Sequence, residues 1–176
     1  MSNRVVLDGP DILRALRRIS HEILEANEGP ENLVILGIPT RGVELAKRIV
    51  EILEAIEPNQ IIEFGILDIT MYRDDLVNAE REILETSLPI SGIDNKVVVL
   101  VDDVLFSART CRQALDALTG YGRVKQVKLA VLVDAGHRYW YVRHGLVVKN
   151  LPTFLSQLVS VQLLGSDGIY QVVFSF

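Results

Sequence analysis

One stretch of the chain decides the fold: residues Val97–Thr110, which are VVVLVDDVLFSART. It starts with five consecutive aliphatic residues, which are typical of a strand buried on both faces of a parallel sheet. The predicted strand runs into two adjacent carboxylates, then into a turn rich in small and hydroxyl residues, and then into a helix predicted over Thr110–Leu118. A strand, a turn and a helix in this order favour an α/β fold, in which ligands bind beyond the carboxyl ends of the strands.

Strands and helices also alternate outward from this stretch in both directions. We therefore expect a central, mostly parallel sheet flanked by helices. No repeat, low-complexity tract or linker divides the chain, so a single domain is predicted over residues 1–176. The polar, acidic stretch from Arg73 to Asn95 has the length and composition of a lid or binding loop. The apolar periodicity predicts helices over Pro10–Ala26 and Gly42–Ile56, strands over Leu33–Gly37, Ile61–Thr70 and Val127–Val133, and further short strands up to Phe176.

The composition excludes several classes of protein. With 176 residues, of which 49% are hydrophobic and 23% charged, the chain can bury a full core without metals or disulfides. Its only cysteine is Cys111, so an intrachain disulfide is excluded and a reducing compartment fits. The N-terminus has no secretory signal pattern, and no apolar run approaches the ~18–20 residues that span a bilayer. We expect a cytoplasmic protein that does not associate with membranes.

The net charge of −5 argues against non-specific nucleic-acid binding, which depends on neutralising phosphates. A local basic face is nevertheless predicted on the first helix, where Arg14, Arg17, Arg18 and His21 recur at spacings of three, four and seven. The alternative is the ordinary solvated outer face of an amphipathic helix. Both interpretations fit the spacing.

The adjacent acids Asp102 and Asp103 are the first candidate functional residues. Two like charges side by side are costly unless they face a cation or offer acceptor atoms to a ligand. The following turn, Phe106–Thr110, supplies backbone N–H groups, two hydroxyls and a helix N-terminus, which together favour an anion. Acids for ribose hydroxyls beside a nest for a phosphate suit a phosphorylated sugar. The alternative is a simple helix-capping turn, which does not require two acids after an aliphatic strand.

Two other segments offer groups to a diphosphate. In Gly37–Gly42, GIPTRG, Thr40 and Arg41 present a hydroxyl, N–H groups and a guanidinium, and Gly42 permits close backbone approach. In Asp68–Asp75, DITMYRDD, Arg73 is placed to meet a diphosphate as it develops charge. Taken alone, the first segment is explained equally well by a plain turn and the second by a surface salt bridge.

These segments resemble a known family. VVLVDDVLFSART is similar to the phosphoribosyl pyrophosphate (PRPP) signature of type I phosphoribosyltransferases. ILGIPTRGVELAKRI, LDITMYRDDL, VDDVLFSARTCRQALDAL, LAVLVDAGHR and VVKNLPT resemble, in order, the bacterial bifunctional pyrimidine operon attenuation regulators and uracil phosphoribosyltransferases, the PyrR family. The resemblance extends from about Val5 to Val173. It implies a type I phosphoribosyltransferase fold with a small hood, contributed by terminal segments and residues 134–176.

The resemblance also implies a function and partners. The expected protein binds pyrimidine-operon mRNA when uridine nucleotides are abundant, and converts uracil and PRPP to UMP and pyrophosphate with Mg²⁺. It is expected to be a homo-oligomer, a dimer or higher, although the apolar tail that ends in Phe174 and Phe176 suits either an interface or a final edge strand.

Each expected role falls on particular residues. Asp102, Asp103 and Arg73 are expected to act in catalysis, with both acids near Mg²⁺. Thr40, Arg41 and Gly42 would form the pyrophosphate loop, and Arg138 would lie on the base side. The candidates for RNA binding are Arg18, His21, Arg143 and Lys149. The residues expected to form the PRPP motif are Val98, Val99, Leu100, Val101, Asp102, Asp103, Val104, Leu105, Phe106, Ser107, Ala108, Arg109 and Thr110.

The chain departs from the family pattern at several places, including Ala135, where the family has an arginine. Ser107-Ala108 stands where the family usually has Thr-Gly, and Pro39 stands where it commonly has a basic residue. The segment Tyr139–Arg143, in the hood region, is aromatic and unlike the family. Two alternatives follow: a phosphoribosyltransferase that does not bind RNA, and a catalytically weak paralogue that senses nucleotides.

Overall fold

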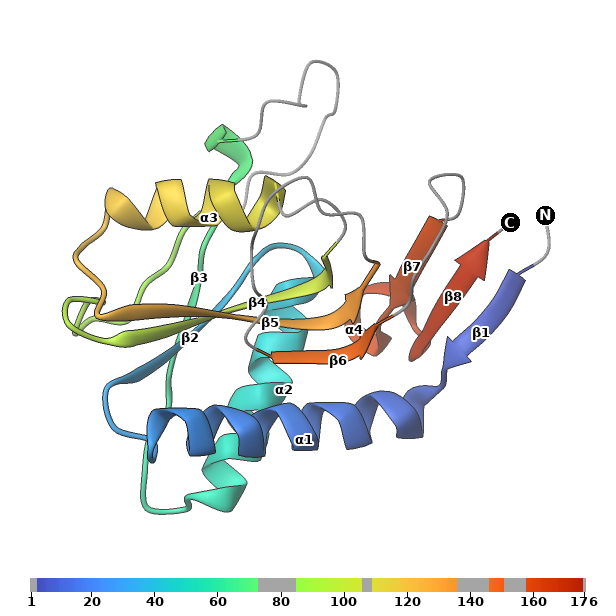
Figure 1. Ribbon diagram of the computed structural model, residues 1–176, viewed down its shortest axis with the longest axis horizontal. Coiled ribbons are helices and arrows are strands. Elements are labelled where there is room, and N and C mark those ends of the chain that lie inside the picture. Colours follow the sequence, from blue (N-terminus) through green and yellow to red (C-terminus); the bar gives the residue numbers. More distant parts are fainter. Residues whose placement is uncertain (1–2, 73–84, 106–108, 136–145, 151–157, 176) are drawn as a thin grey trace.

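The computed structural model describes residues 3–72, 85–105, 109–135, 146–150 and 158–175, which form two sheets with helices (Figure 1). The side chains of residue 3 and of residues 146–150 are not among those described. In chain order the elements are β1 (Asn3–Leu7), α1 (Gly9–Asn27), β2 (Leu33–Gly37), α2 (Arg41–Ile56), β3 (Glu63–Ile66), the 3₁₀ turn η1 (Thr70–Tyr72), β4 (Val97–Leu105), α3 (Arg109–Thr119), β5 (Gln126–Asp134), β6 (Leu146–Asn150), β7 (Leu158–Gln162), α4 (Leu164–Asp167) and β8 (Gln171–Ser175).

The main sheet has the strand order β3-β2-β4-β5-β6, and every pairing in it is parallel. The predicted α/β class is therefore confirmed. The chain leaves β2 toward β3 on one side and later returns to form β4 on the other side. The direction of winding thus reverses between β2 and β4, and ligands of open α/β sheets bind at such a switch point.

Helices cover both faces of this sheet, with α1 and α2 on one side and α3 on the other (Figure 1). Strand β4 lies in the middle and is buried on both faces, which explains its run of aliphatic residues. Its Val97, Val99 and Val101 belong to the core beneath α1 and α2. Val98 and Leu100 belong to the core beneath α3.

The first helix is amphipathic, as predicted, and buries Ile12, Leu16, Ile19 and Ile23. It begins with a capping box in which the Asp8 carboxylate accepts the backbone N–H of Asp11 at 2.8 Å. Such caps satisfy N–H groups that have no partner within the helix. Among the described residues, no helix combines the length and the apolar character that crossing a bilayer requires.

A smaller antiparallel sheet joins the two ends of the chain in the order β1-β8-β7 (Figure 1). Strand β8 lies between the other two and is therefore not the edge strand considered from the sequence. Its Val172 is buried in the core beneath α1. Val173 is also buried, and Phe174 is partly buried. This packing accounts for most of the apolar tail, while Phe176 lies outside the described residues.

The predicted strand over Ile61–Thr70 was too long, because β3 spans only Glu63–Ile66. The chain turns at Asp68, whose carboxylate accepts the backbone N–H of Thr70 at 2.7 Å and the Thr70 hydroxyl at 2.5 Å. Such a side-chain acceptor competes with strand pairing and favours a turn. The short turn η1 follows directly.

Edge strand β3 is joined to the segment before β4 by a charged cluster. The Glu63 carboxylate accepts hydrogen bonds from the Ser91 hydroxyl and the Lys96 ammonium. Burial raises the pKa of Glu63, but these two donors outweigh it and hold that pKa below its ordinary value of 4.5. The ionised form of Glu63 is therefore favoured by folding.

This shift has a definite sign in a stability measurement. The contribution of Glu63 to the free energy of unfolding is fully present above pH 4.5, and it is lost as the pH falls through the lowered pKa. In urea unfolding we expect Glu63→Gln to cost about 1 kcal/mol at neutral pH, and the difference from wild type to shrink in acid. Exposed Glu25→Gln is the control. If Glu63→Gln and wild type differed in their free energy of unfolding by the same amount at every pH, the lowered pKa of Glu63 would be contradicted.

Candidate functional site

The turn after β2 and the end of β4 meet at the switch point. The Ile38 backbone N–H donates to the Val101 carbonyl at 2.9 Å, which joins the turn to the strand. Gly42 lies directly against the same strand: a Cβ added there would overlap the Val101 carbonyl oxygen and lie 3.2 Å from the Asp102 Cα. The close approach predicted at Gly42 is thus an approach to β4. It brings the first turn of α2 next to Asp102.

Both acids of the motif lie within β4. The strand predicted over Val97–Val101 was too short, because β4 continues to Leu105. The reason is the neighbouring strand: β5 extends in parallel register to Asp134 and pairs with β4 as far as Leu105. Pairing with β2 ends at Val101, so beyond this point β4 pairs with β5 alone among the described strands.

The two carboxylates are half-buried and are oriented by local hydrogen bonds. Asp102 accepts the backbone N–H of Asp103 at 2.9 Å, and Asp103 accepts that of Val104 at 2.8 Å. Burial, and then the charge of Asp102, raise the pKa of the Cys111 thiol in α3. Asp102 therefore lies near α3.

The other acid lies on the α2 side. The pKa of Arg41 is raised above its ordinary value, first by its hydrogen bonds to Asp167 and with a smaller contribution from the charge of Asp103. Asp103 is thus close enough to Arg41 to interact with its charge. A ligand across the end of β4 would have one acid toward each flanking helix.

The helix after the motif begins at Arg109, and its N-terminal N–H groups and positive dipole end favour an anion. Thr110, in its first turn, is half-buried, and Arg109 is exposed. Val98–Val101 are buried within β4, Leu105 is buried in the core beneath α3, and Val104 packs against the core beneath α1 and α2. Phe106, Ser107 and Ala108 lie outside the described residues.

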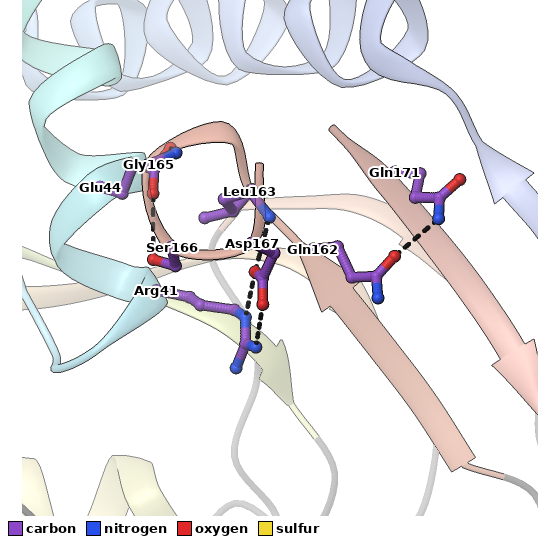
Figure 2. Close-up of polar contacts among 8 residues, drawn as sticks. All are labelled: Arg41, Glu44, Gln162, Leu163, Gly165, Ser166, Asp167 and Gln171. Carbon is purple, nitrogen blue, oxygen red and sulfur yellow. Dashed lines mark hydrogen bonds and ion pairs between the residues drawn. The ribbon is translucent and has the colours of Figure 1, made fainter. Parts of the chain in front are cut away.

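Arg41 is held by a residue that the sequence did not point to. Its guanidinium donates through Nη2 and Nε to the two carboxylate oxygens of Asp167, at 2.9 and 3.2 Å (Figure 2). Thr40 precedes α2, and within the described part of the chain its hydroxyl makes no capping bond to that helix. The proposed pyrophosphate loop is therefore joined to the corner between β7 and β8.

A second acid was missed in the sequence. Asp134 ends β5, is 2% exposed and lies opposite Leu105 of β4. The sequence contains a signal for it, because Asp134 directly follows the apolar run Leu129–Val133, just as Asp102 directly follows Val97–Val101. Asp134 thus lies at the same end of the sheet as the predicted acids.

The remaining candidates are less well placed by the structure. Arg73, Arg138 and Arg143 lie outside the described residues, and Lys149 is in β6 with its side chain not described. Arg18 and His21 are on the exposed face of α1. An acid offsets the charge of Arg18, since its Nε lies 3.4 Å from the carboxylate of Glu22.

The acids also bear on the expected magnesium ion. Within residues 3–72, 85–105, 109–135 and 158–175, no group of three or more histidine, cysteine, aspartate or glutamate side chains is arranged to hold a metal. Mg²⁺ commonly uses one or two protein carboxylates together with water and substrate phosphates. Asp102 and Asp103 fit that requirement when a phosphate ligand supplies the remaining oxygens.

A groove of about 470 Å³ opens beside α2, lined by residues that include Thr40, Val43, Glu44, Leu164 and Gly165. It borders the loop at Thr40 but includes neither Asp102 nor Asp103. We therefore place the candidate site at the end of β4 rather than in this groove.

The chain is similar to known proteins over most of its length. The phosphoribosyl transferase domain family matches residues 2–158. A bifunctional protein PyrR of Streptomyces coelicolor is 55% identical over 166 residues, which cover 94% of this chain and 86% of that protein. A bifunctional protein PyrR of Leifsonia xyli is 56% identical over 173 residues, covering 96% and 94%.

Solved structures are similar in fold at low identity. A hypoxanthine phosphoribosyltransferase from Trypanosoma cruzi has a TM-score of 0.73 at 15% identity, covering 96% of this chain and 92% of that one. A hypoxanthine phosphoribosyltransferase from Staphylococcus aureus has a TM-score of 0.64 at 18% identity, covering 86% and 80%. These likenesses show the fold alone.

Proposed function

The chain belongs to the phosphoribosyltransferase family and, within it, to the bifunctional PyrR proteins, and from this premise we propose two activities for it. It regulates pyrimidine operon expression by binding mRNA in a manner that depends on uridine nucleotides. It also transfers ribose-5-phosphate from PRPP to uracil, with UMP and pyrophosphate as products.

One observation carries the catalytic half of this proposal: the Thr40–Gly42 turn and the acids of β4 meet at the switch point of the sheet. PRPP is a ribose with a phosphate at one end and a diphosphate at the other, so it needs two anion-binding elements with ribose acceptors between them. The first turn of α3 serves the 5-phosphate, and Thr40 and Arg41 serve the diphosphate. Asp102 and Asp103 lie between them.

The chemistry follows from the charges. The bond between ribose C1 and the diphosphate oxygen breaks, a bond from C1 to a uracil nitrogen forms, and that nitrogen loses its proton. Positive charge develops on the ribose during this exchange, and the carboxylates of Asp102 and Asp103 stabilise it. Asp102 and Asp103 would help to hold Mg²⁺ bound with PRPP, and the ion would supply positive charge that offsets the negative charge of the pyrophosphate.

Several parts of the proposal rest on sequence. Arg73 would contact the pyrophosphate and Arg138 the base, and the polar stretch after Asp75 would exclude water during transfer. For RNA we propose a face that contains Arg18, His21, Arg143 and Lys149. The small sheet β1-β8-β7 would contribute to the hood over the base. We further propose a cytoplasmic homo-oligomer.

The experiment that tests the catalytic half is a panel of bases. Purified protein is mixed with PRPP, Mg²⁺ and one free base at a time, and pyrophosphate release is followed. We expect release with uracil, and none when either PRPP or Mg²⁺ is left out. Release only with a purine would indicate a phosphoribosyltransferase of another specificity, and no release with any base would indicate a nucleotide-sensing protein.

The regulatory half is tested by retention of pyrimidine-operon leader RNA on a filter, with and without UMP, at a stated salt concentration. We expect UMP to increase retention. An RNA of the same length and scrambled sequence is the control, because non-specific binding to phosphates would retain both RNAs equally. Equal retention would reject the regulatory half and leave the catalytic half standing.

A further inference from the structure

The first turn of α2 is tied to the corner between β7 and β8 by two separate sets of contacts. We call this corner, residues Leu163–Gly168, the α4 corner. Arg41 donates to Asp167, and Glu44 accepts the Gly165 N–H at 2.9 Å and the Ser166 hydroxyl at 3.2 Å (Figure 2). Both contacts span more than a hundred residues of sequence, so the α4 corner is fastened to the proposed pyrophosphate loop from across the fold.

Asp167 is itself held in place. Its carboxylate also accepts the Leu163 backbone N–H, at 2.9 Å, so the acid is anchored to its own corner. The hydrogen bond from Arg41, and then the one from Leu163, lower the pKa of Asp167 below its ordinary value of 3.8. The acid is therefore ionised at neutral pH, and it presents two fixed oxygens to the guanidinium.

The way in which Arg41 is held leaves part of it available. A guanidinium has five N–H donors in one plane, and the pair with Asp167 uses the edge formed by Nε and Nη2. No contact given by the described residues uses Nη1. The opposite edge, formed by Nη1 and Nη2, has the fork geometry that binds phosphate through two parallel hydrogen bonds. The charge of Asp103 also contributes to raising the pKa of the same guanidinium.

We propose that Asp167 is a positioning residue for the diphosphate of PRPP, which holds one edge of Arg41 so that the other edge is ready to bind phosphate. The proposal rests on the proposed function. Arginine has several freely rotating bonds, and fixing them before the ligand arrives reduces the entropy lost on binding. Asp167 itself touches no substrate in this arrangement.

An opposite effect of Asp167 must be weighed against this. A carboxylate near the site also repels a diphosphate, and its removal would relieve that repulsion. The Arg41 and Asp167 side chains are 36% and 21% exposed, so water and salt screen the repulsion over the longer distance to the ligand. The direct pair at 2.9 Å is less affected, so we expect positioning to dominate.

The test compares two variants that each remove one acid near Arg41. Asp167→Asn keeps an oxygen for the Leu163 N–H but loses the charged fork. Glu44→Gln removes a second negative charge near Arg41 and weakens the other tie to the α4 corner, while it leaves the pair with Asp167 intact. The kinetic constants for PRPP and for uracil are measured, together with calorimetric binding of PRPP and Mg²⁺.

We expect Asp167→Asn to raise KM for PRPP by about tenfold, with kcat and KM for uracil changed by less than about twofold. Glu44→Gln should change KM for PRPP by less than about twofold. In an Arg41→Gln background, Asp167→Asn should have no further effect, because it acts through Arg41. Asp167→Glu, which keeps the charge, should recover part of the PRPP affinity.

Other outcomes overturn the proposal. Unchanged or tighter PRPP binding in Asp167→Asn would show that repulsion dominates. Equal losses in Asp167→Asn and Glu44→Gln, or losses that persist in the Arg41→Gln background, would show a merely structural tie. Wild-type protein that binds PRPP but does not convert uracil would reject the proposed function, and the calorimetric comparison would still decide the role of Asp167.

Discussion

Replacing Asp103 by asparagine is expected to lower kcat/KM for PRPP by roughly 10²–10³-fold, because the ribose then loses a negative charge where positive charge develops. Asparagine keeps the size of the side chain and one oxygen that accepts the Val104 N–H, so the fold should be retained. Most of the loss should appear in kcat, since the charge on the ribose is greatest in the transition state. The measurement is steady-state pyrophosphate release at several PRPP concentrations.

The matched control for this variant is Asp116→Asn, which makes the same chemical change on the exposed face of α3. Its kinetics should equal those of wild type. Thermal unfolding of both variants checks that Asp103→Asn is folded. Wild-type turnover by Asp103→Asn would remove the acids of β4 from the candidate site.

The second large effect is expected for Gly42→Ala. A methyl group at this position would overlap the Val101 carbonyl oxygen and press on the Asp102 Cα, and both are backbone atoms of a central strand. Neither can move without disturbing the sheet, so we expect a loss of about 3 kcal/mol of stability, or roughly 6–12 °C in Tm. PRPP binding should fall as well, because the first turn of α2 must shift away from β4.

Gly120→Ala is the control, since a Cβ at that position meets nothing closer than 3.4 Å. It should leave Tm within about 2 °C and PRPP binding unchanged. Differential scanning calorimetry and PRPP titration measure both quantities. A Gly42→Ala protein with wild-type Tm and affinity would mean that α2 does not pack on β4 as described.

The sequence was enough to predict the α/β class, the middle strand and the importance of the two acids that follow its aliphatic run. These features are encoded within short windows: five aliphatic residues in a row indicate a strand buried on both faces, whatever lies elsewhere in the chain. Helix α1 was predicted for the same reason, since its buried residues recur at helical spacing. The family resemblance of ordered segments then pointed to PRPP and to PyrR proteins.

The predictions that failed concerned features that are set by neighbouring strands in the sheets. Strand β4 extends past Val101 because β5 continues beside it, and no pattern inside Val97–Thr110 records the length of another strand. Strand β8 is central rather than an edge because β1, from the far end of the chain, pairs with it. Strand pairing is a long-range interaction, so a single segment does not reveal it.

Val97–Thr110 was therefore sufficient by itself to predict a phosphorylated sugar as the ligand, because it places acids and an N–H nest close together in sequence. Only the tertiary structure decided how the second loop is arranged. It packs Gly42 on β4, and it places Asp167 against Arg41 from 126 residues away. That pair exists because α4 lies between two strands of the small sheet, at the end of the main sheet from which α2 starts (Figure 1), an arrangement that depends on how distant segments pack rather than on any local pattern of residues.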